Sequence, residues 1–205
     1  MGDKTKEDHC VTDDPAIPTT VSGALEQIEG RSTRLRLVRP DDASYIHELR
    51  TNPAFNAHMS PVPGGVEEQR AWIERYKLRE ADCAELYYIV EQRRTRQPCG
   101  TVRLYDIGAD SFTWGSWILD ASKPPKAALE SAVLSFQVGF DQLRKVVGRV
   151  EVRRENARAI AFYRRFGMNE TSADTQNLHF ECLPEHFWRA YDIWWAAIEA
   201  VDQEC

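Results

Sequence analysis

The sequence predicts an α/β protein built on one mixed sheet with helices on both faces. Segments with the two-residue alternation of strands and segments with helical spacing follow one another in the order β-α-α-β-β-β-α-β-α-β, with room for a further strand near the end. Short turns join the middle strands as hairpins, whereas helices separate the later ones, so antiparallel and crossover connections are combined. The 205 residues suffice for one domain with a substantial core.

The regular part of the chain is expected to begin close to residue 33. Residues 1–32 contain little apolar material and are predicted to form a flexible tail, with at most a short helical piece around "ALEQI". A half-exposed strand follows in "RLRLVRP", where leucines alternate with arginines. Two helices come next, in "PDDASYIHELR", capped by Asp41 or Asp42, and in "VEEQRAWIERYKLREA", whose acidic first turn suits the helix dipole.

The middle and end of the chain supply the other strands and two crossover helices. Strands are predicted in "LYYIVE", "CGTVRLYDI", "SFTWGSWIL", "VVGRVEVR" and "LHFECL". Helices are predicted in "AALESAVLSFQVGFDQL" and in "ARAIAFYRRFG", where Gly167 suits the position just after the helix. These segments define one domain at residues 33–184.

Residues 185–205 are predicted to form an added helix rich in aromatic side chains. In "EHFWRAYDIWWAAIEAV", one face carries Trp188, Tyr191, Trp195 and Ile198. This face is too apolar to stay in water. It either packs on the same domain or forms a homodimer contact, and the sequence leaves both alternatives open.

The composition excludes several classes of protein. A net charge of −6 argues against a nucleic-acid partner, and no apolar run approaches the roughly 20 residues that span a membrane. The N-terminus is polar without a signal-peptide core, and five scattered cysteines form no disulfide framework, so a cytoplasmic location is expected. No metal site is expected, because His179 and Cys182 are three apart in a strand and lie on opposite faces.

Three stretches resemble the GNAT superfamily of acetyl-CoA-dependent N-acetyltransferases across residues 33–184. They are "LRLVRPDDASYIHELR", "WGSWILDASKPPKAALESAVLSFQVGFDQL" and "VEVRRENARAIAFYRRFGM". Within the superfamily, the middle of the chain looks most like the enzymes that acetylate nucleotide-linked amino-sugars, while the branch that modifies ribosomal-protein N-termini shares the front and back motifs. The resemblance implies a mostly antiparallel sheet of six to seven strands.

The resemblance also implies where acetyl-CoA binds. The strand before the phosphate loop would splay from its neighbour and pair with the pantetheine amides, and the following loop and helix N-terminus would hold the pyrophosphate. The family's loop pattern is Arg or Gln, two residues, Gly, one residue, then Gly or Ala. An Asn after the next strand would bind the pantetheine arm, and a Tyr seven residues later would protonate the leaving thiolate. The implied cofactor residues are Trp117, Ile118, Leu119, Lys123, Lys126, Ala127, Ala128, Asn156 and Tyr163.

The phosphate loop "SKPPKAALES" departs from the family pattern because it contains no glycine. Pro124 and Pro125 have no N–H to offer a phosphate, although Pro125 would suit the first position of the helix. The remaining donors would be the four N–H groups of residues 126–129. We therefore predict a pyrophosphate site that is shifted toward the helix and depends more on the charges of Lys123 and Lys126.

The catalytic groups have competing structural readings. Tyr163 could serve as the acid or be an ordinary core aromatic, and Asn156 could contact the cofactor or cap the helix that follows. The N–H of Ile118 or Leu119 is the candidate oxyanion donor. The strand at 112–119 has no carboxylate to act as the general base. Candidates elsewhere are His58, Asp106 and Glu151, with His58 also a candidate for contact with the acceptor.

A candidate acceptor surface comes from the two central strands. Arg103 and Tyr105 are two apart and share a face, as do Trp114 and Ser116. Arg103 could bind a diphosphate and the aromatic side chains a sugar or base. Alternatively, Trp114 and Trp117, three apart and so on opposite faces, simply bury on the two sides of the sheet.

Three functions fit these observations. The favoured one is acetyl transfer, in a ternary complex, from acetyl-CoA to a small amine, namely that of a nucleotide-linked amino-sugar. The second is N-terminal acetylation of a protein, which needs an open groove rather than a pocket. The third is a non-catalytic acyl-CoA-binding module, which would have no use for the hydroxyl of Tyr163.

Overall fold

The computed structural model describes residues 23–61 and 63–200, which form one eight-stranded sheet. The strand order is β1-β2-β3-β4-β5-β6-β8-β7, and within the described residues β5 and β6 are the one parallel pair of neighbours. The predicted mixed, mostly antiparallel sheet is confirmed, with more strands than the expected six to seven. The strands are β1 Gln27–Glu29, β2 Thr33–Leu37, β3 Leu86–Gln92, β4 Pro98–Tyr105, β5 Ser111–Leu119, β6 Val147–Arg153, β7 Asn169–Ala173 and β8 Asn177–Cys182.

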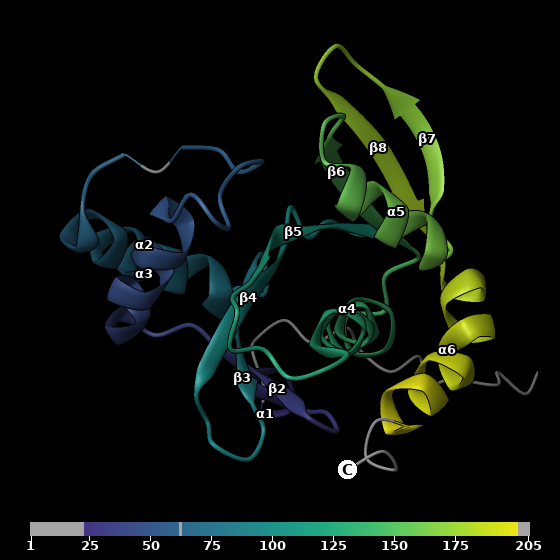
Figure 1. Ribbon diagram of the computed structural model, residues 1–205, viewed down its shortest axis with the longest axis horizontal. Helices are drawn as coiled ribbons and strands as arrows, with labels where there is room; N and C mark the ends of the chain where they lie inside the picture. Colours follow the sequence, from purple (N-terminus) through teal and green to yellow (C-terminus); the bar gives the residue numbers. More distant parts are fainter. Residues whose placement is uncertain (1–22, 62, 201–205) are drawn as a thin grey trace, which may run out of the picture.

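Helices cover both faces of the sheet, as predicted (Figure 1). On one side lie α2 and α3, and on the other lie α4 and α6. Along the chain, α5 connects β6 to β7. None of the described helices is long and apolar enough to cross a membrane. The helices are α1 Gly23–Glu26, α2 Ala43–Thr51, α3 Val66–Ala81, α4 Ala127–Gln137, α5 Ala157–Arg165 and α6 Pro184–Glu199, with a 3-10 turn at Pro40–Asp42 and a π-helical turn at Val138–Gln142.

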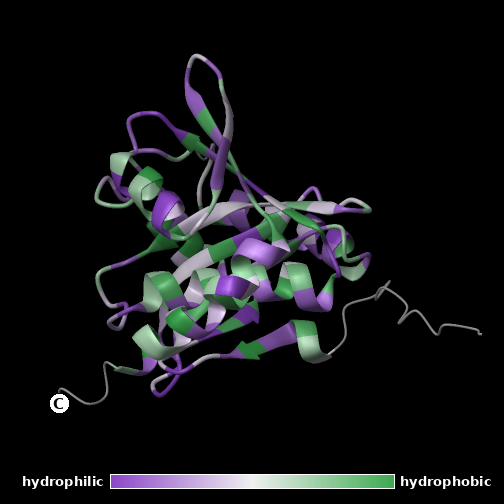
Figure 2. Cartoon of the chain, turned by 90° about the vertical axis from the view of Figure 1, so that its right-hand side faces the viewer, coloured by the Kyte–Doolittle hydropathy of each residue, from purple (hydrophilic) through white to green (hydrophobic). Residues whose placement is uncertain are grey.

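Each face of the sheet buries its own apolar core. On β4, Val102 and Leu104 point to the larger core under α4 and α6. On β3, Tyr87 and Ile89 point to the smaller core under α2 and α3. Figure 2, seen from the side of α6, shows that the helices carry both hydrophobic and hydrophilic residues. Because successive strand residues point to opposite faces of the sheet, each strand contributes side chains to two separate surfaces.

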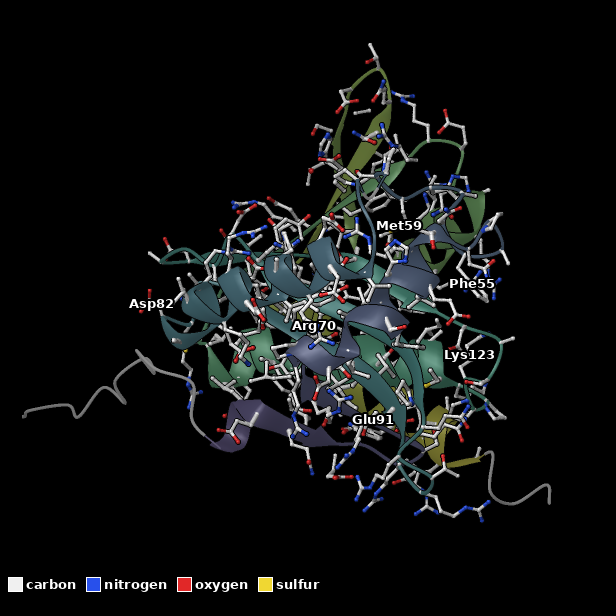
Figure 3. The ribbon with its side chains drawn as sticks, turned by 90° about the vertical axis from the view of Figure 1, so that its left-hand side faces the viewer. Phe55, Met59, Arg70, Asp82, Glu91 and Lys123 are labelled. Carbon is white, nitrogen blue, oxygen red and sulfur yellow. The ribbon has the colours of Figure 1, made fainter. Side chains whose placement is uncertain are left out.

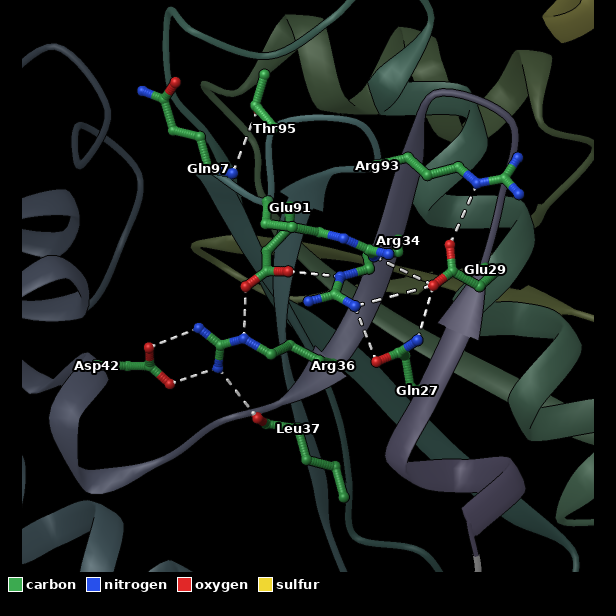
Figure 4. A network of polar contacts seen from close by, with 11 residues as sticks. Gln27, Glu29, Arg34, Arg36, Leu37, Asp42, Glu91, Arg93, Thr95 and Gln97 are labelled. Carbon is green, nitrogen blue, oxygen red and sulfur yellow. Dashed lines mark hydrogen bonds and ion pairs between the residues drawn. The ribbon is translucent and has the colours of Figure 1, made fainter.

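The domain begins earlier than the predicted boundary at residue 33. The helical piece expected around "ALEQI" is present as α1, but the flexible-tail prediction is wrong for residues 27–29, because β1 pairs antiparallel with β2. Leu25 is buried and its carbonyl accepts the hydroxyl of Tyr88 at 3.0 Å. Arg34 and Arg36 of β2 both donate to Glu91 of β3 (Figure 4). The tail at residues 1–22 lies outside the described residues.

The carboxylate of Glu130 ties the β1–β2 turn to the first turns of α4. Glu130 is fully buried and accepts the N–H groups of Arg31, Ser32 and Thr33, together with the hydroxyl of Ser32 at 2.5 Å. A Cβ at Gly30 would lie 2.4 Å from Oε1 of Glu130, so only glycine fits beside it. The carboxylate thereby fixes the helix that follows the predicted phosphate loop.

The C-terminal helix packs on its own domain through a face that overlaps the predicted one, since Ile198 is buried and Tyr191 and Trp195 pack against the core. Phe187, Trp194 and Ile198 are buried, and Trp194 stacks on Phe166 with ring centroids 4.2 Å apart. Trp188 is 41% exposed, so its placement in the buried face was wrong. The homodimer contact remains a hypothesis for the outward face.

Candidate active site

The parallel strands β5 and β6 separate part of the way along. Their pairing stops at Trp114 opposite Val150. Beyond this point β5 continues to Leu119 paired with β4, while β6 continues to Arg153 paired with β8. One edge of residues 115–119 therefore has no partner strand within the described chain, which is the splayed geometry expected for a pantetheine site.

A β-bulge lies on β5 just beyond the separation. Ser116 has φ 46°, a left-handed conformation, and the register with β4 shifts there. The extra residue brings Trp114 and Trp117 to the same side of the sheet, with ring centroids 5.0 Å apart, so the prediction of opposite faces is wrong. Their indole N–H groups donate to Ser135 at 2.8 Å and Ser131 at 3.1 Å in α4.

Tyr163 lies beside the point where the two strands separate. It is 6% exposed and packs edge-on against Trp114, with ring centroids 6.0 Å apart. No described residue forms a hydrogen bond with its hydroxyl. Burial, and then the nearby Tyr105, raise the pKa of Tyr163, so the phenol keeps its proton through neutral and alkaline pH. A protonated hydroxyl without a competing partner is suited to donate to a leaving thiolate.

Tyr105 approaches the same place from the opposite face of the sheet. It lies over Gly115, where an added Cβ would come within 3.3 Å of the Cε1 atom of Tyr105 and 3.4 Å of its hydroxyl oxygen. The charge of an ionised Tyr105 would also raise the pKa of Tyr163. The absence of a side chain at Gly115 therefore leaves room for the ring of Tyr105 at the strand separation.

The three candidate bases occupy different surroundings. Burial raises the pKa of Tyr105, and the carboxylates of Asp106 and Glu151 add to that rise, so both carboxylates lie near the Tyr105 side of the site. Asp106 is exposed with φ 48°, which is also consistent with a purely structural role in the turn. His58 is exposed in the segment between α2 and α3 and makes no hydrogen bond with a described residue.

The segment before α4 is held by its own polar contacts. The carboxylate of Asp120 accepts the N–H of Ser122 and the hydroxyl of Tyr45, both at 2.8 Å. Lys123 donates through Nζ to the carbonyl of Asp120 at 3.1 Å, so this lysine is partly engaged by the loop itself. Figure 3 shows Lys123 at the same end of the α2–α3 layer as Phe55 and Met59, with Asp82 at the other end.

α4 begins at Ala127, which corrects the prediction that Pro125 is the first helical residue. Lys126 is the N-cap with φ 61° and ψ 1°, and the carbonyl of Pro124 accepts the N–H of Ala127 at 3.2 Å. These contacts form a turn whose third position requires a positive φ, normally met by glycine. Lys126 therefore adopts the conformation for which the family pattern uses glycine. One predicted donor, the N–H of Ala127, is occupied by the turn.

Replacing Lys126 with glycine separates the backbone strain at this position from the charge. We expect Lys126→Gly to keep or raise the free energy of unfolding by up to about 1 kcal/mol, because glycine tolerates the left-handed conformation. We expect its affinity for acetyl-CoA to fall about 3- to 10-fold at low salt, with a weaker salt dependence, because the exposed ammonium is lost. Lys126→Ala is the matched control that loses the charge and keeps the strain. Wild-type affinity and salt slope in both variants would show that the ammonium does not contact the phosphates.

Asn156 is the N-cap of α5. Its Oδ1 accepts the N–H of Ala159 at 3.1 Å, while its side-chain N–H₂ group donates to no described residue. The capping prediction is thus confirmed, and the free amide N–H group still leaves a donor for the pantetheine arm. The two roles use different atoms and are compatible.

Two substitutions at Asn156 distinguish capping from cofactor binding. Asn156→Ser keeps a capping oxygen but cannot extend an amide N–H, so we expect little change in stability and a KM for acetyl-CoA raised about 10-fold. Asn156→Ala loses both functions and should also lose about 1 kcal/mol of stability. Urea denaturation and steady-state kinetics measure the two effects. A serine variant with the wild-type KM would limit Asn156 to capping.

Arg103 lies in a cluster of aromatic and charged side chains on the α3 side of the sheet. Its guanidinium lies over the rings of Trp72, 5.2 Å from the centroid, and Tyr105, 4.8 Å away. Its Nε donates to the buried carboxylate of Glu85, which also accepts from Arg79 at 2.7 Å. Sequence reasoning missed Glu85, because its contact with Arg103 depends on the register between β3 and β4. Arg103 is thus only partly available to an acceptor.

The other half of the predicted acceptor set lies elsewhere. Trp114 is 1% exposed and faces α4, so it does not share a surface with Arg103 and Tyr105. Ser116 presents its carbonyl to the hydroxyl of Thr101 at 2.9 Å, so the bulge touches the α3 side through its backbone. Arg103 and Tyr105 are the pair from this set that the structure places together.

A pocket of about 320 Å³ lies between α2 and α3 on this side of the sheet. Its wall includes Arg50 of α2 and Gln69, Trp72 and Arg75 of α3. We call it the α2–α3 pocket. Trp72 belongs both to this wall and to the cluster around Arg103, so the pocket adjoins the Tyr105 side of the strand separation. The sequence did not identify Arg50 or Arg75 as site residues, because arginines on the polar faces of helices are common.

The family model described as the GNAT acetyltransferase domain matches residues 33–169. No curated protein matches the chain. The matched range includes the splayed strand, the phosphate loop, Asn156 and Tyr163.

Solved structures of several acetyltransferases are similar to this chain. A structure titled apo FdhC, a nucleotide-linked sugar GNAT, is 35% identical with a TM-score of 0.74, covering 80% of this chain and 93% of its own. A spermidine N-acetyltransferase SpeG chimera from Vibrio cholerae is 20% identical with a TM-score of 0.66, covering 77% and 99%. A ribosomal-protein-S5-alanine acetyltransferase from Vibrio fischeri is 13% identical with a TM-score of 0.65, covering 77% and 96%. The last two establish a shared fold alone.

Proposed function

This chain belongs to the GNAT acetyltransferase family, and from that premise we propose that it acetylates the amine of a nucleotide-linked amino-sugar. GNAT domains use acetyl-CoA as their co-substrate. The observation that supports the proposal best is the separation of β5 from β6 at Trp114, with the ring of Tyr163 packed against Trp114 on one face and Tyr105 lying over Gly115 on the other. A thioester on one face and an amine on the other can then react directly in a ternary complex.

The proposed cofactor site runs along the open edge of β5 to the start of α4. The backbone of residues 117–119 pairs with the pantetheine amides, and the free N–H groups at the start of α4 hold the pyrophosphate. Lys123 and Lys126 supply charge beside it. Asn156 donates to the pantetheine arm through its amide N–H group.

The proposed chemistry needs three groups at the strand separation. The neutral amine attacks the thioester carbonyl, and an N–H of the disrupted ladder beside Ser116 stabilises the oxyanion. Tyr163 then protonates the leaving thiolate. Asp106 and Glu151 flank Tyr105 and are the favoured bases, with His58 a further candidate. A sugar amine is less basic than a lysine side chain, so a weak base suffices.

The charges on the acceptor side favour an anionic acceptor over a polyamine. Arg50, Arg75 and Arg103 all border this side, and Arg75 forms no ion pair with a described residue. A polycation would be repelled here, whereas a diphosphate would be attracted. The similarity to a nucleotide-linked sugar GNAT agrees with this choice. Protein N-terminal acetylation stays the second candidate.

Thermal-shift measurements test the proposal. We expect acetyl-CoA to raise the Tm, and a nucleotide-linked amino-sugar to raise it further in the presence of CoA. Spermidine and an N-terminal ribosomal-protein peptide serve as the comparison acceptors. A shift with the peptide and none with any nucleotide-linked sugar would favour the second candidate.

A further inference from the structure

Arg50, which lines the α2–α3 pocket, has a buried polar atom that lacks a partner. The Nε–H of Arg50 is buried and has no hydrogen-bond acceptor in the described structure. The same guanidinium donates through Nη2 to the carbonyl of Ser60 at 3.4 Å, a long contact. A charged donor left without an acceptor is costly, which is why such groups in native proteins usually have a ligand or water partner.

A second buried polar group lies on the same side of the sheet as Arg50. The hydroxyl of Tyr87 is fully buried, lies beside the hydroxyl of Thr101 without a well-formed hydrogen bond, and is influenced by the charges of Arg50 and Arg103. Thr101 lies beside it and donates its own proton to the carbonyl of Ser116 at the bulge. Tyr87 and Thr101 thus place polar groups between the α3 side of the sheet and the carbonyl of Ser116 at the bulge.

The rest of the pocket wall also favours an anion. Gln69 is 4% exposed and its side-chain amide bonds to no described residue. Arg75 is exposed and forms no ion pair among the described residues. The opposing carboxylate, Glu68, is already bound by the N–H of Gly65 at 2.8 Å. The pocket wall therefore contains two guanidinium groups and an amide that can donate to an anion, and one carboxylate that already accepts a backbone N–H.

We propose that the α2–α3 pocket binds the diphosphate of the acceptor's nucleotide through Arg50 and Arg75. The inference rests on the proposed function, because it assigns one part of the same acceptor. Bidentate guanidinium–phosphate contacts satisfy the free donor of Arg50, and Gln69 adds a neutral donor. The amine at the other end of the acceptor then extends past Trp72 toward Tyr105 and the strand separation.

The test measures UDP and dTDP binding by calorimetry in saturating CoA, which blocks the cofactor site. Binding to the wild type is expected, with affinity about 10- to 100-fold lower in Arg50→Gln and in Arg75→Gln. Arg75 is exposed, so its variant should fold even where Arg50→Gln does not. Arg70→Gln is the matched control on α3, since Arg70 pairs with Asp41 and does not line the pocket. It should bind as the wild type does.

Tyr87→Phe distinguishes a binding role of the Tyr87 hydroxyl from a purely structural role. Removing an unpartnered buried hydroxyl should leave the Tm unchanged or higher, while nucleotide affinity falls about 3- to 10-fold. Wild-type UDP affinity in the arginine variants, or no binding to the wild type, overturns the assignment. If nucleotide-linked amino-sugars are still acetylated, the proposed function survives that result. If none is acetylated by the wild type, the proposed function itself is wrong.

Discussion

Tyr163→Phe should lower kcat about 100- to 1,000-fold while leaving the KM for acetyl-CoA and the Tm nearly unchanged. The substitution removes one hydroxyl that no described residue binds, so the packing of the ring against Trp114 is retained. What it removes is the proton for the thiolate, and general-acid catalysis contributes roughly 10²- to 10⁴-fold in enzymes. Steady-state kinetics with a thiol-detecting reagent measures the effect.

The matched control is Tyr191→Phe. Tyr191 donates to Gln137 at 3.2 Å on the far side of α4, away from the strand separation, and its variant should keep the wild-type kcat. The pH profile adds a second check. Because burial raises the pKa of Tyr163 above its ordinary value, the acid stays protonated and kcat should show no loss from this group up to about pH 10. A Tyr163→Phe variant with a kcat within threefold of the wild type would assign the tyrosine to packing alone.

Glu130→Ala should lower the free energy of unfolding by about 3–5 kcal/mol, the largest stability loss we expect from a single substitution. Three backbone N–H groups and one hydroxyl donate to this buried carboxylate, and each donor left unsatisfied costs about 1–3 kcal/mol before the structure relaxes. Urea denaturation followed by circular dichroism measures the loss. Because Glu130 anchors the start of α4, the KM for acetyl-CoA should rise as well.

Two controls make the result specific. Glu130→Gln retains one acceptor oxygen and the size of the side chain, so about half of the loss is expected. Glu74→Ala removes an exposed glutamate of α3 that forms no ion pair within the described structure, and it should change stability by less than about 0.5 kcal/mol. A loss below about 1 kcal/mol in Glu130→Ala would mean that the β1–β2 turn finds other partners.

The sequence was sufficient to predict most elements, and physical reasons account for those it missed. The alternation along β4 and the 16-residue helix α3 were visible because each buries one face against a core. β1 has three residues, too few to show a period, and all five residues of β7 are exposed, so no apolar alternation marks it. Such strands are determined by their neighbours through backbone pairing.

Site residues that belong to a sequence motif could be predicted. Features of the site that depend on the backbone conformation could not. Asn156 caps α5 and Tyr163 lies about two helical turns later, against Trp114 of the splayed strand. The sequence did not indicate the left-handed conformations of Ser116 and Lys126, because neither residue is glycine. The bulge at Ser116 reversed the side predicted for Trp117, since one extra residue shifts every later side chain to the other face.

The α2–α3 pocket could not be predicted from the sequence at all. Arg50, Arg75 and Tyr87 belong to two helices and a strand, and their proximity depends on how the α2–α3 layer rests on the sheet. On the sequence alone, the two arginines are ordinary solvated helix residues. Their significance comes from the pocket that both line, from the buried Nε–H of Arg50, and from the absence of an ion pair to Arg75 within the described structure.

The most direct test of the account is a comparison of kcat/KM for acetyl transfer among acceptors of different charge. The purified full chain would be assayed with acetyl-CoA and three acceptors: a nucleotide-linked amino-sugar, the same amino-sugar without its nucleotide, and spermidine. We predict the highest kcat/KM for the nucleotide-linked sugar, at least about 100-fold above the free sugar, since the pocket should contribute diphosphate contacts. A kcat/KM for spermidine equal to or above that of every nucleotide-linked amino-sugar would contradict the account.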